Sequence, residues 1–281
     1  MNAPWATHRA LDLLEAGLRH QASAGHPDPG LRFWKGLLMT QNKIIGLPAE
    51  RPIRDALILK IGGVCTIVGA IAFGTLRVLH GDTPGADPRA SLAFVATRPI
   101  YAGVHIGAVF AALLTLAGLI ALASSLTRPG AWMLGRLGVA SSLVGMAIFG
   151  VESTSEGLAL PELAHASANA PADQQAELAR AAQAVLAVTH GPSLVAIALL
   201  YGISLVLFGL AVVLDDYPSW LGWAGIVVGG ATLAAATGQY LQPDLMPGFL
   251  IYGVLASILA QLWLISLAVV MLRRARSAPG T

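Results

Sequence analysis

Histidine and carboxylate side chains lie close to the ends of several long apolar stretches of this chain. His105 follows the start of one such stretch, His190 precedes another, and Glu152 comes directly after a third. Two imidazoles and a carboxylate form a ligand set suited to zinc, iron or copper, and paired histidines on facing helices can also hold a haem. We therefore predict a metal site formed by His105, His190 and Glu152, with a transition metal or haem as its cofactor.

A second group of residues could supply acid–base chemistry beside that metal. Glu152 and Glu156 are four residues apart, which places them on one face of a helix. Two carboxyl groups held so close together favour retention of a proton by one of them. Tyr101 lies one helical turn before His105 and could orient its imidazole. These spacings predict Glu152, Glu156 and Tyr101 as catalytic residues.

Residue counts along the apolar stretches place these side chains at one level. Measured from the opposite end of each stretch at 1.5 Å per helical residue, they lie roughly 28–38 Å along their helices. His80, Gln239, Tyr240 and Tyr252 fall at or near the same level. We predict Gln239, Tyr240 and Tyr252 as substrate-binding residues. The alternative is that all of these are ordinary polar residues at a water interface, where they cost little and need not converge.

The composition indicates which kind of element must hold these residues. Hydrophobic residues make up 56% of the chain, charged residues only 11%, and the mean hydropathy of +0.69 argues against a soluble protein. Apolar runs of about 20 residues are long enough for a helix to cross roughly 30 Å of hydrocarbon. We therefore expect an all-α, polytopic transmembrane bundle with the lipid bilayer as its partner. The net charge of +2 is small, and no nucleic-acid partner is expected.

The apolar runs predict six membrane spans. The second and third are joined by a four-residue turn, so they should be antiparallel neighbours. Spaced glycines within the runs favour close contacts between helices. The loop at 81–99 is rich in Gly, Pro and Asp and is expected to be irregular. The predicted spans cover residues 57–79, 100–126, 131–151, 191–214, 220–240 and 247–272.

The membrane domain is expected to cover residues 57–272, with short regions at both ends. Residues 1–56 should form a cytoplasmic amphipathic region. Within it, a basic helix at 31–47 lies either in the headgroup plane or packed under the bundle. Residues 273–281 should form a basic cytoplasmic tail.

One long acidic segment at 152–189 separates the third span from the fourth. We expect Pro161 and Pro171 to divide it. Residues 173–189 then read as a helix that starts with acidic residues. This helix is expected to cover the bundle as a lid at the membrane surface or to continue into the fourth span.

Lys and Arg residues are distributed unevenly between the two sides of the predicted bundle. Thirteen would lie on the side of the N-terminus and four on the opposite side. Because loops rich in Lys and Arg stay in the cytoplasm, both termini are expected to be cytoplasmic. The protein is then a multi-pass protein of the cell (inner) membrane, and the level of polar residues faces outward.

The motif Tyr217-Pro-Ser-Trp-Leu-Gly-Trp223 opens the fifth predicted span. Together with the long segment before the fourth span, it resembles a broad group of uncharacterised bacterial membrane proteins with six or seven spans. The resemblance covers residues 100–241. It implies a polytopic helical fold and brings no catalytic residues with it.

Three functions are compatible with this pattern. The first is an intramembrane enzyme that depends on a metal or haem at the outer level of His, Glu and Tyr. The second is a binding or transport protein for a lipid or apolar small molecule, and the third is a structural membrane subunit. The sequence contains no HExxH, GxSxG or CxxC motif. No charged residue lies at the middle of any predicted span, which argues against an ion-coupled transporter.

Overall fold

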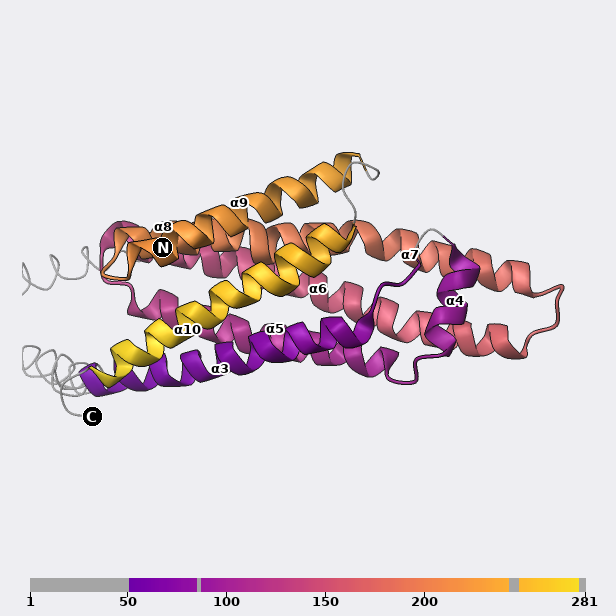
Figure 1. The fold of residues 1–281 in the computed structure, drawn as a ribbon, viewed down its shortest axis with the longest axis horizontal. Coiled ribbons are helices and arrows are strands. Elements are labelled where there is room, and N and C mark those ends of the chain that lie inside the picture. Colours follow the sequence, from indigo (N-terminus) through magenta and orange to yellow (C-terminus); the bar gives the residue numbers. More distant parts are fainter. Residues whose placement is uncertain (1–50, 85–86, 243–247, 278–281) are drawn as a thin grey trace, which may run out of the picture. The chain divides into compact units, whose positions relative to one another are not determined.

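A computed structural model of the protein describes residues 51–84, 87–242 and 248–277 (Figure 1). The chain forms two compact units, Met1–Arg54 and Asp55–Thr281. Nearly all of the described residues belong to the second unit. The predicted N-terminal interfacial helix lies outside the described residues.

Every regular element in the described part of the chain is helical, and six continuous helical stretches are long and apolar enough to cross a membrane. The prediction of an all-α polytopic bundle is therefore confirmed, and the protein is a multi-pass membrane protein. The elements are α3 (Arg51–His80), α4 (Pro88–Ala96), α5 (Tyr101–Ser125), α6 (Pro129–Asn169), α7 (Gln175–Ile197), the π-helix η1 (Ala198–Ile203), α8 (Ser204–Leu214), α9 (Ser219–Leu241), the π-helix η2 (Phe249–Leu259) and α10 (Ala260–Arg276).

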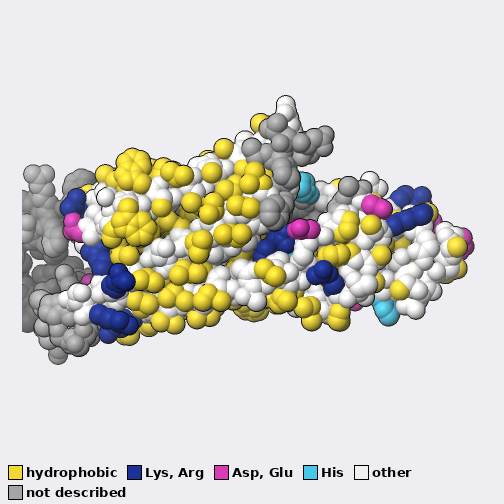
Figure 2. Space-filling view, viewed as in Figure 1, with side chains coloured by type: hydrophobic (Ala, Val, Ile, Leu, Met, Phe, Trp, Pro, Cys, Tyr) yellow, Lys and Arg dark blue, Asp and Glu magenta, His cyan; other side chains and the backbone are white. Residues whose placement is uncertain are grey.

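The surface of the bundle carries the apolar belt that a bilayer requires. On the face shown in Figure 2, hydrophobic side chains cover the region of α3, α9 and α10, and charged side chains lie at one end of this region and beyond its other end. Large side chains such as Ile61, Val68 and Phe110 are half or more exposed. Such exposure is unfavourable in water and favourable against lipid.

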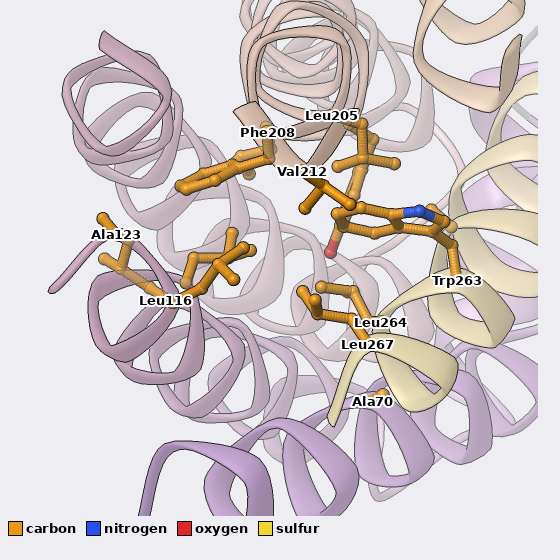
Figure 3. Close-up of a cluster of buried hydrophobic side chains, with 14 of the residues drawn as sticks. Ala70, Leu116, Ala123, Leu205, Phe208, Val212, Trp263, Leu264 and Leu267 are labelled. Atoms are coloured by element: carbon orange, nitrogen blue, oxygen red, sulfur yellow. The ribbon is translucent and has the colours of Figure 1, made fainter. Parts of the chain in front are cut away.

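The bundle interior is filled by large apolar side chains from α8 and α10. In Figure 3, Val212 lies toward Leu264 and Leu267, whereas the ring of Phe208 lies toward Leu116 of α5; Leu205 and these side chains are all buried. Nearby, the indole N–H of Trp263 in α10 donates to the carbonyl of Leu221 in α9 at 2.8 Å. This bond satisfies the one polar atom of a side chain that otherwise packs as a hydrophobe.

The predicted close approach of helices at glycines is present at several contacts. A Cβ atom at Gly118 in α5 would lie 1.6 Å from the Thr66 hydroxyl oxygen in α3. A Cβ atom at Gly209 in α8 would lie 2.6 Å from the Gly222 carbonyl oxygen in α9. Because these gaps admit no side chain, the glycines determine how closely the two pairs of helices pack.

The loop expected to be irregular contains a helix instead. The Asp87 carboxylate caps α4 by accepting from the backbone N–H groups of Arg89 and Ala90, and Pro88 occupies the first turn. Helix α4 then packs across α6 and α7 through a small apolar core, here called the cap cluster. The cap cluster consists of Leu92, Val95, Tyr101, Leu160, Ala164 and Ala182.

The segment at 152–189 continues the third and fourth spans as one helical hairpin. Helix α6 is 41 residues long, roughly 60 Å at 1.5 Å per residue and about twice the thickness of the hydrocarbon. The prediction that Pro161 divides the segment is wrong, because α6 runs through it. Leu160 and Ala164 are buried in the cap cluster on either side of that proline, and their burial offsets the lost hydrogen bond. Pro171 does lie in the turn between α6 and α7.

Two spans contain π-helical segments at the same end of the bundle. The fourth span passes from α7 through η1 into α8, and the sixth passes from η2 into α10. The Ser141 hydroxyl of α6 donates to the Leu199 carbonyl in η1 at 2.9 Å. Long π-helices are rare, and π-helical turns occur frequently at functional sites.

At the opposite end of the bundle, Asp215 joins two connecting turns. Its carboxylate accepts from the backbone N–H groups of Thr127 at 2.8 Å and Arg128 at 3.1 Å, and from its neighbour Asp216 at 2.8 Å. Burial acts to raise the pKa of this carboxyl group, but the three backbone donors together outweigh burial, and its pKa lies below the ordinary value. The turn between α5 and α6 is thereby fixed to the turn between α8 and α9.

Candidate functional site

A cavity of about 1050 Å³ lies at the His80 end of the bundle. It is bounded by α3, α5, α6, α7, α9 and both π-helical segments. Its polar lining includes Arg77, His80, His105, Glu152, Ser153, Glu156, Gln183, His190, Ser193, Gln239 and Tyr252. Its apolar lining includes Phe73, Leu76, Val104, Ala108, Phe149, Ile197, Leu200, Tyr201 and Ala256. The polar level expected from residue counts is thus largely gathered in one place.

His80 is the last residue of α3, and the turn that follows it determines its orientation. Gly81 has a φ of +69°, a left-handed conformation that ends the helix and that residues with a side chain rarely adopt. The His80 Nδ1–H group donates to the Gly81 carbonyl at 2.7 Å. The Arg77 guanidinium donates to the same carbonyl at 2.7 Å, and that of Arg98 donates to the His80 carbonyl at 3.0 Å. The imidazole is therefore held by a turn that two arginines fix.

His105 is buried inside the bundle on α5, with 6% of its surface exposed. Its Nδ1–H group donates to the Tyr101 carbonyl one turn earlier at 3.0 Å. The side chain lies against Gly157 of α6, where an added Cβ atom would be 2.5 Å from the His105 Cβ atom. Its ring meets the ring of His80 edge to face, with 4.8 Å between their centroids. The glycine on α6 therefore makes the space that His105 occupies.

Glu156 faces the two histidines from α6. Its Oε1 atom accepts from the Tyr101 hydroxyl at 2.9 Å and lies 3.9 Å from Nε2 of His105. The Tyr101 ring is almost fully buried in the cap cluster, with its centroid 4.5 Å from that of His105 and 5.2 Å from that of His80. Tyr101 thus connects the carboxylate to both imidazoles.

His80, His105 and Glu156 have the geometry of a metal-binding group. One ligand atom from each residue lies within 4.8 Å of the others. In each imidazole Nδ1 carries the proton that is donated to a backbone carbonyl, so Nε2 of the neutral ring keeps its lone pair. Metal-binding histidines are oriented by the same kind of hydrogen bond from the second ring nitrogen. No ion is needed to explain the hydrogen bonds, but the arrangement is suited to one.

The other residues predicted as ligands lie around this group. Glu152 is almost fully buried one turn before Glu156, lines the cavity and accepts from the Ser153 hydroxyl at 3.3 Å. His190 lines the same cavity from α7 and is exposed. The structure therefore brings His105, Glu152 and His190 into the wall of one cavity, but the compact group of three contains only His105 of these.

The residues predicted to bind substrate are divided between two environments. Gln239 of α9 and Tyr252 of η2 line the cavity. Tyr240 is 60% exposed and does not belong to the cavity lining. Adjacent residues on a helix point about 100° apart, and here only Gln239 of the two is turned toward the cavity.

His80 was placed at the polar level by its position but was not predicted as a ligand. The available signal was its location at the end of the first span, directly before a glycine in a loop rich in Gly, Pro and Asp. A glycine after the last helical residue is typical of a left-handed helix end. The left-handed helix end at Gly81 influences the direction in which the His80 side chain points, and helical spacing alone does not predict that direction.

Comparison with known proteins places the chain in a family but gives no activity. No curated protein and no solved structure matches the chain. The family described as "Domain of unknown function (DUF4386)" matches residues 58–268, which include all six spans at least in part. This match covers well over half of the sequence, and the chain belongs to this family of uncharacterised function.

Proposed function

We propose that this membrane protein binds one divalent transition-metal ion through His80, His105 and Glu156, and that the ion acts on a molecule bound in the adjoining cavity. The observation that carries the proposal is the convergence of the three ligand atoms within 4.8 Å. Two ligand atoms on a tetrahedral zinc ion at about 2.0–2.2 Å are roughly 3.3–3.6 Å apart. The 3.9 Å between His105 Nε2 and Glu156 Oε1 exceeds that separation by about half an ångström or less. An ion that draws in the remaining ligand atoms must shorten their separations by about 1 Å or more.

The arrangement favours a single ion over a haem. The His80 and His105 rings are in direct edge-to-face contact at 4.8 Å. A haem held by two histidines must place its flat macrocycle between the two rings. Because the His80 and His105 rings are in direct contact, there is no space between them for a macrocycle. A single ion needs only the space between Nε2 atoms and a carboxylate oxygen.

The surrounding residues support catalysis at such an ion. Two histidines and one glutamate are a ligand set of catalytic zinc, which leaves a further position for water or a substrate oxygen. A zinc ion held by His80, His105 and Glu156 would supply a water acidic enough to be deprotonated near neutral pH. Glu152, one turn from Glu156 in the cavity wall, can accept the proton. In this proposal Tyr101 orients the Glu156 carboxylate through its 2.9 Å hydrogen bond.

Metal analysis of the purified protein tests the proposal. The protein is prepared in detergent with an affinity tag that contains no histidine, exposed to zinc, iron, manganese or copper, and freed of loose metal. We expect about one ion per chain for one of these metals. His80→Ala and Glu156→Gln should lose it, whereas His165→Ala, an exposed histidine on α6, should retain it.

His190→Ala separates the two possible ligand sets. Retention of metal by this variant supports the group of His80, His105 and Glu156. Loss of metal supports the set of His105, His190 and Glu152 predicted from sequence. A wild-type protein that retains none of the four metals refutes the proposal.

The size of the cavity favours a second candidate, a binding or transport protein for a lipid or apolar small molecule. At about 1050 Å³, the cavity is slightly larger than the usual volumes of small-molecule pockets, about 300–1,000 Å³. Its lining includes many apolar side chains. Stable binding of such a molecule by protein that retains no metal would support this candidate.

A further inference from the structure

The cavity has two chemically different ends. His80, His105 and Glu156 form its polar end. Phe73 in α3 and Phe149 in α6 each lie seven residues closer to the middle of the bundle, roughly 10 Å at 1.5 Å per residue. These two rings are 6.1 Å apart, and Phe73 is 5.8 Å from the ring of Tyr201 in η1.

Small residues line the apolar end of the cavity beside the aromatic rings. Ala108 lies three residues beyond His105 on α5, and Ala256 lies in η2. The π-helical segments contribute both Tyr201 and Ala256 to this wall. An apolar group bound in this part of the cavity would lie beside Phe73, Phe149 and Tyr201.

The charges at the polar end select the head group. Glu152 and Glu156 are two carboxylates within one helical turn. Arg77, the arginine among the lining residues, forms an ion pair with Asp82. One bound divalent ion would offset the two glutamates and leave no excess positive charge. An anionic head group would therefore meet repulsion or, at best, neutrality. A hydroxyl, ester or amide oxygen meets no such cost.

We infer that the cavity binds a single-chain amphiphile with an uncharged, oxygen-bearing head group. The head lies at His80, His105 and Glu156, and the chain extends past Ala108 toward Phe73, Phe149 and Tyr201. The placement of the head oxygen on a metal ion rests on the proposed function. The placement of the chain rests only on the size and apolar lining of the cavity.

Native mass spectrometry of the protein in detergent tests this inference with three probes. A monoacylglycerol with a 16-carbon chain should bind with one molecule per chain. The free fatty acid anion of the same chain length should bind at least tenfold more weakly, because its head is charged. A monoacylglycerol with a four-carbon chain should also bind at least tenfold more weakly, because each buried methylene group contributes to affinity.

A pair of variants on α5 tests where the chain lies. Ala108→Phe fills the apolar end and should weaken binding of the long monoacylglycerol about tenfold or more, since it displaces two or more methylene groups. Ile106→Phe is the matched control, because Ile106 is exposed on the outer face of the same helix and its substitution should leave binding unchanged. If Ala108→Phe does not fold, Ala256→Leu narrows the same space from η2.

The outcomes separate this inference from the proposed function. Equal binding of the fatty acid anion, equal binding of the short chain, or equal effects of the two α5 variants would each overturn it. Metal content is measured on the same samples. A protein without metal that still shows the head-group and chain-length preferences refutes the proposed function and supports the inference. A protein that holds one metal ion but shows neither preference supports the proposed function and refutes the inference.

Discussion

Substitution of Gly157 by alanine should disturb the metal site without a direct change to any ligand. The added Cβ atom would lie 2.5 Å from the His105 Cβ atom and 2.9 Å from its Cγ atom. Carbon atoms in contact are normally about 3.5–4.0 Å apart, so His105 must move by about 1 Å or more. Metal–ligand distances tolerate only about 0.2 Å. We therefore expect metal affinity to fall by about 10–100-fold, the range found when the support of a ligand is lost.

The effect of Gly157→Ala on stability should be modest, so that the protein still folds. Alanine favours a helix over glycine by about 1 kcal/mol, and overpacking a buried contact costs about 1–3 kcal/mol, so the net loss is between zero and about 2 kcal/mol. Gly150→Ala is the matched control, because Gly150 lies on the same helix with nothing within 4 Å of its would-be Cβ atom. Gly150→Ala therefore gains the higher helix propensity of alanine, and its Cβ atom meets no neighbouring residue.

Competition with a chromophoric zinc chelator measures the affinity, and thermal melting followed by circular dichroism measures the stability of the same preparations. The expected pattern is weak metal binding by a folded Gly157→Ala protein and normal binding by Gly150→Ala. Wild-type affinity in Gly157→Ala would refute the reasoning, since it would mean that the His105 imidazole can move by an ångström without consequence. In that case His105 is not a ligand.

Three further predictions concern other parts of the molecule. Tyr101→Phe removes the hydroxyl that donates to Glu156; the chelator assay should show metal affinity about 10–100-fold lower, and unchanged affinity would exclude an orienting role. Asp215→Asn should lower the free energy of unfolding by roughly 1–3 kcal/mol at neutral pH. Because the folded-state pKa of Asp215 is lowered, this contribution is present above about pH 4 and is lost as the pH falls through the folded-state value, so melting temperatures of variant and wild type should converge in acid. Persistence of the difference there would contradict this origin. In a Cys65→Ala background, Ala168→Cys should react with a membrane-impermeant thiol reagent added outside intact cells; reaction from the cytoplasmic side alone would invert the proposed topology.

The six spans follow from sequence because the bilayer imposes a simple requirement of length and apolarity. The parts that differ from expectation depend on contacts between distant segments. The local rule that proline interrupts a helix fails at Pro161, because burial of Leu160 and Ala164 against α4 and α7 keeps α6 continuous. Helix α4 was not predicted, because the residues around it are rich in Gly, Pro and Asp, which form turns. The pair Asp87-Pro88 is nevertheless a typical start of a helix.

The sequence predicts how far along its helix each residue of the candidate site lies, but not the direction in which its side chain points. Residue counts along a helix give the height of a side chain, and Tyr101, His105 and Glu156 do lie together in the structure. The direction of each side chain around its helix axis depends on packing and on local departures from α-helical geometry. The left-handed Gly81 after His80 is such a departure. The choice of His80 over His190 in the compact group therefore could not be read from spacing.

The continuous path of α6 and α7 from the bundle to their common turn offers an experimental handle. A protein of 29.0 kDa gives too little signal for its particle images to be aligned by electron cryomicroscopy without a fiducial. An antibody fragment raised against the turn between Asn169 and Gln175 would be attached through unbroken helices rather than through a hinge. Its orientation in the images would then report directly on the helix that carries Glu152 and Glu156. Fragments that bind this turn and change the tilt of α6 would move Glu152 and Glu156 relative to the histidines on α3 and α5.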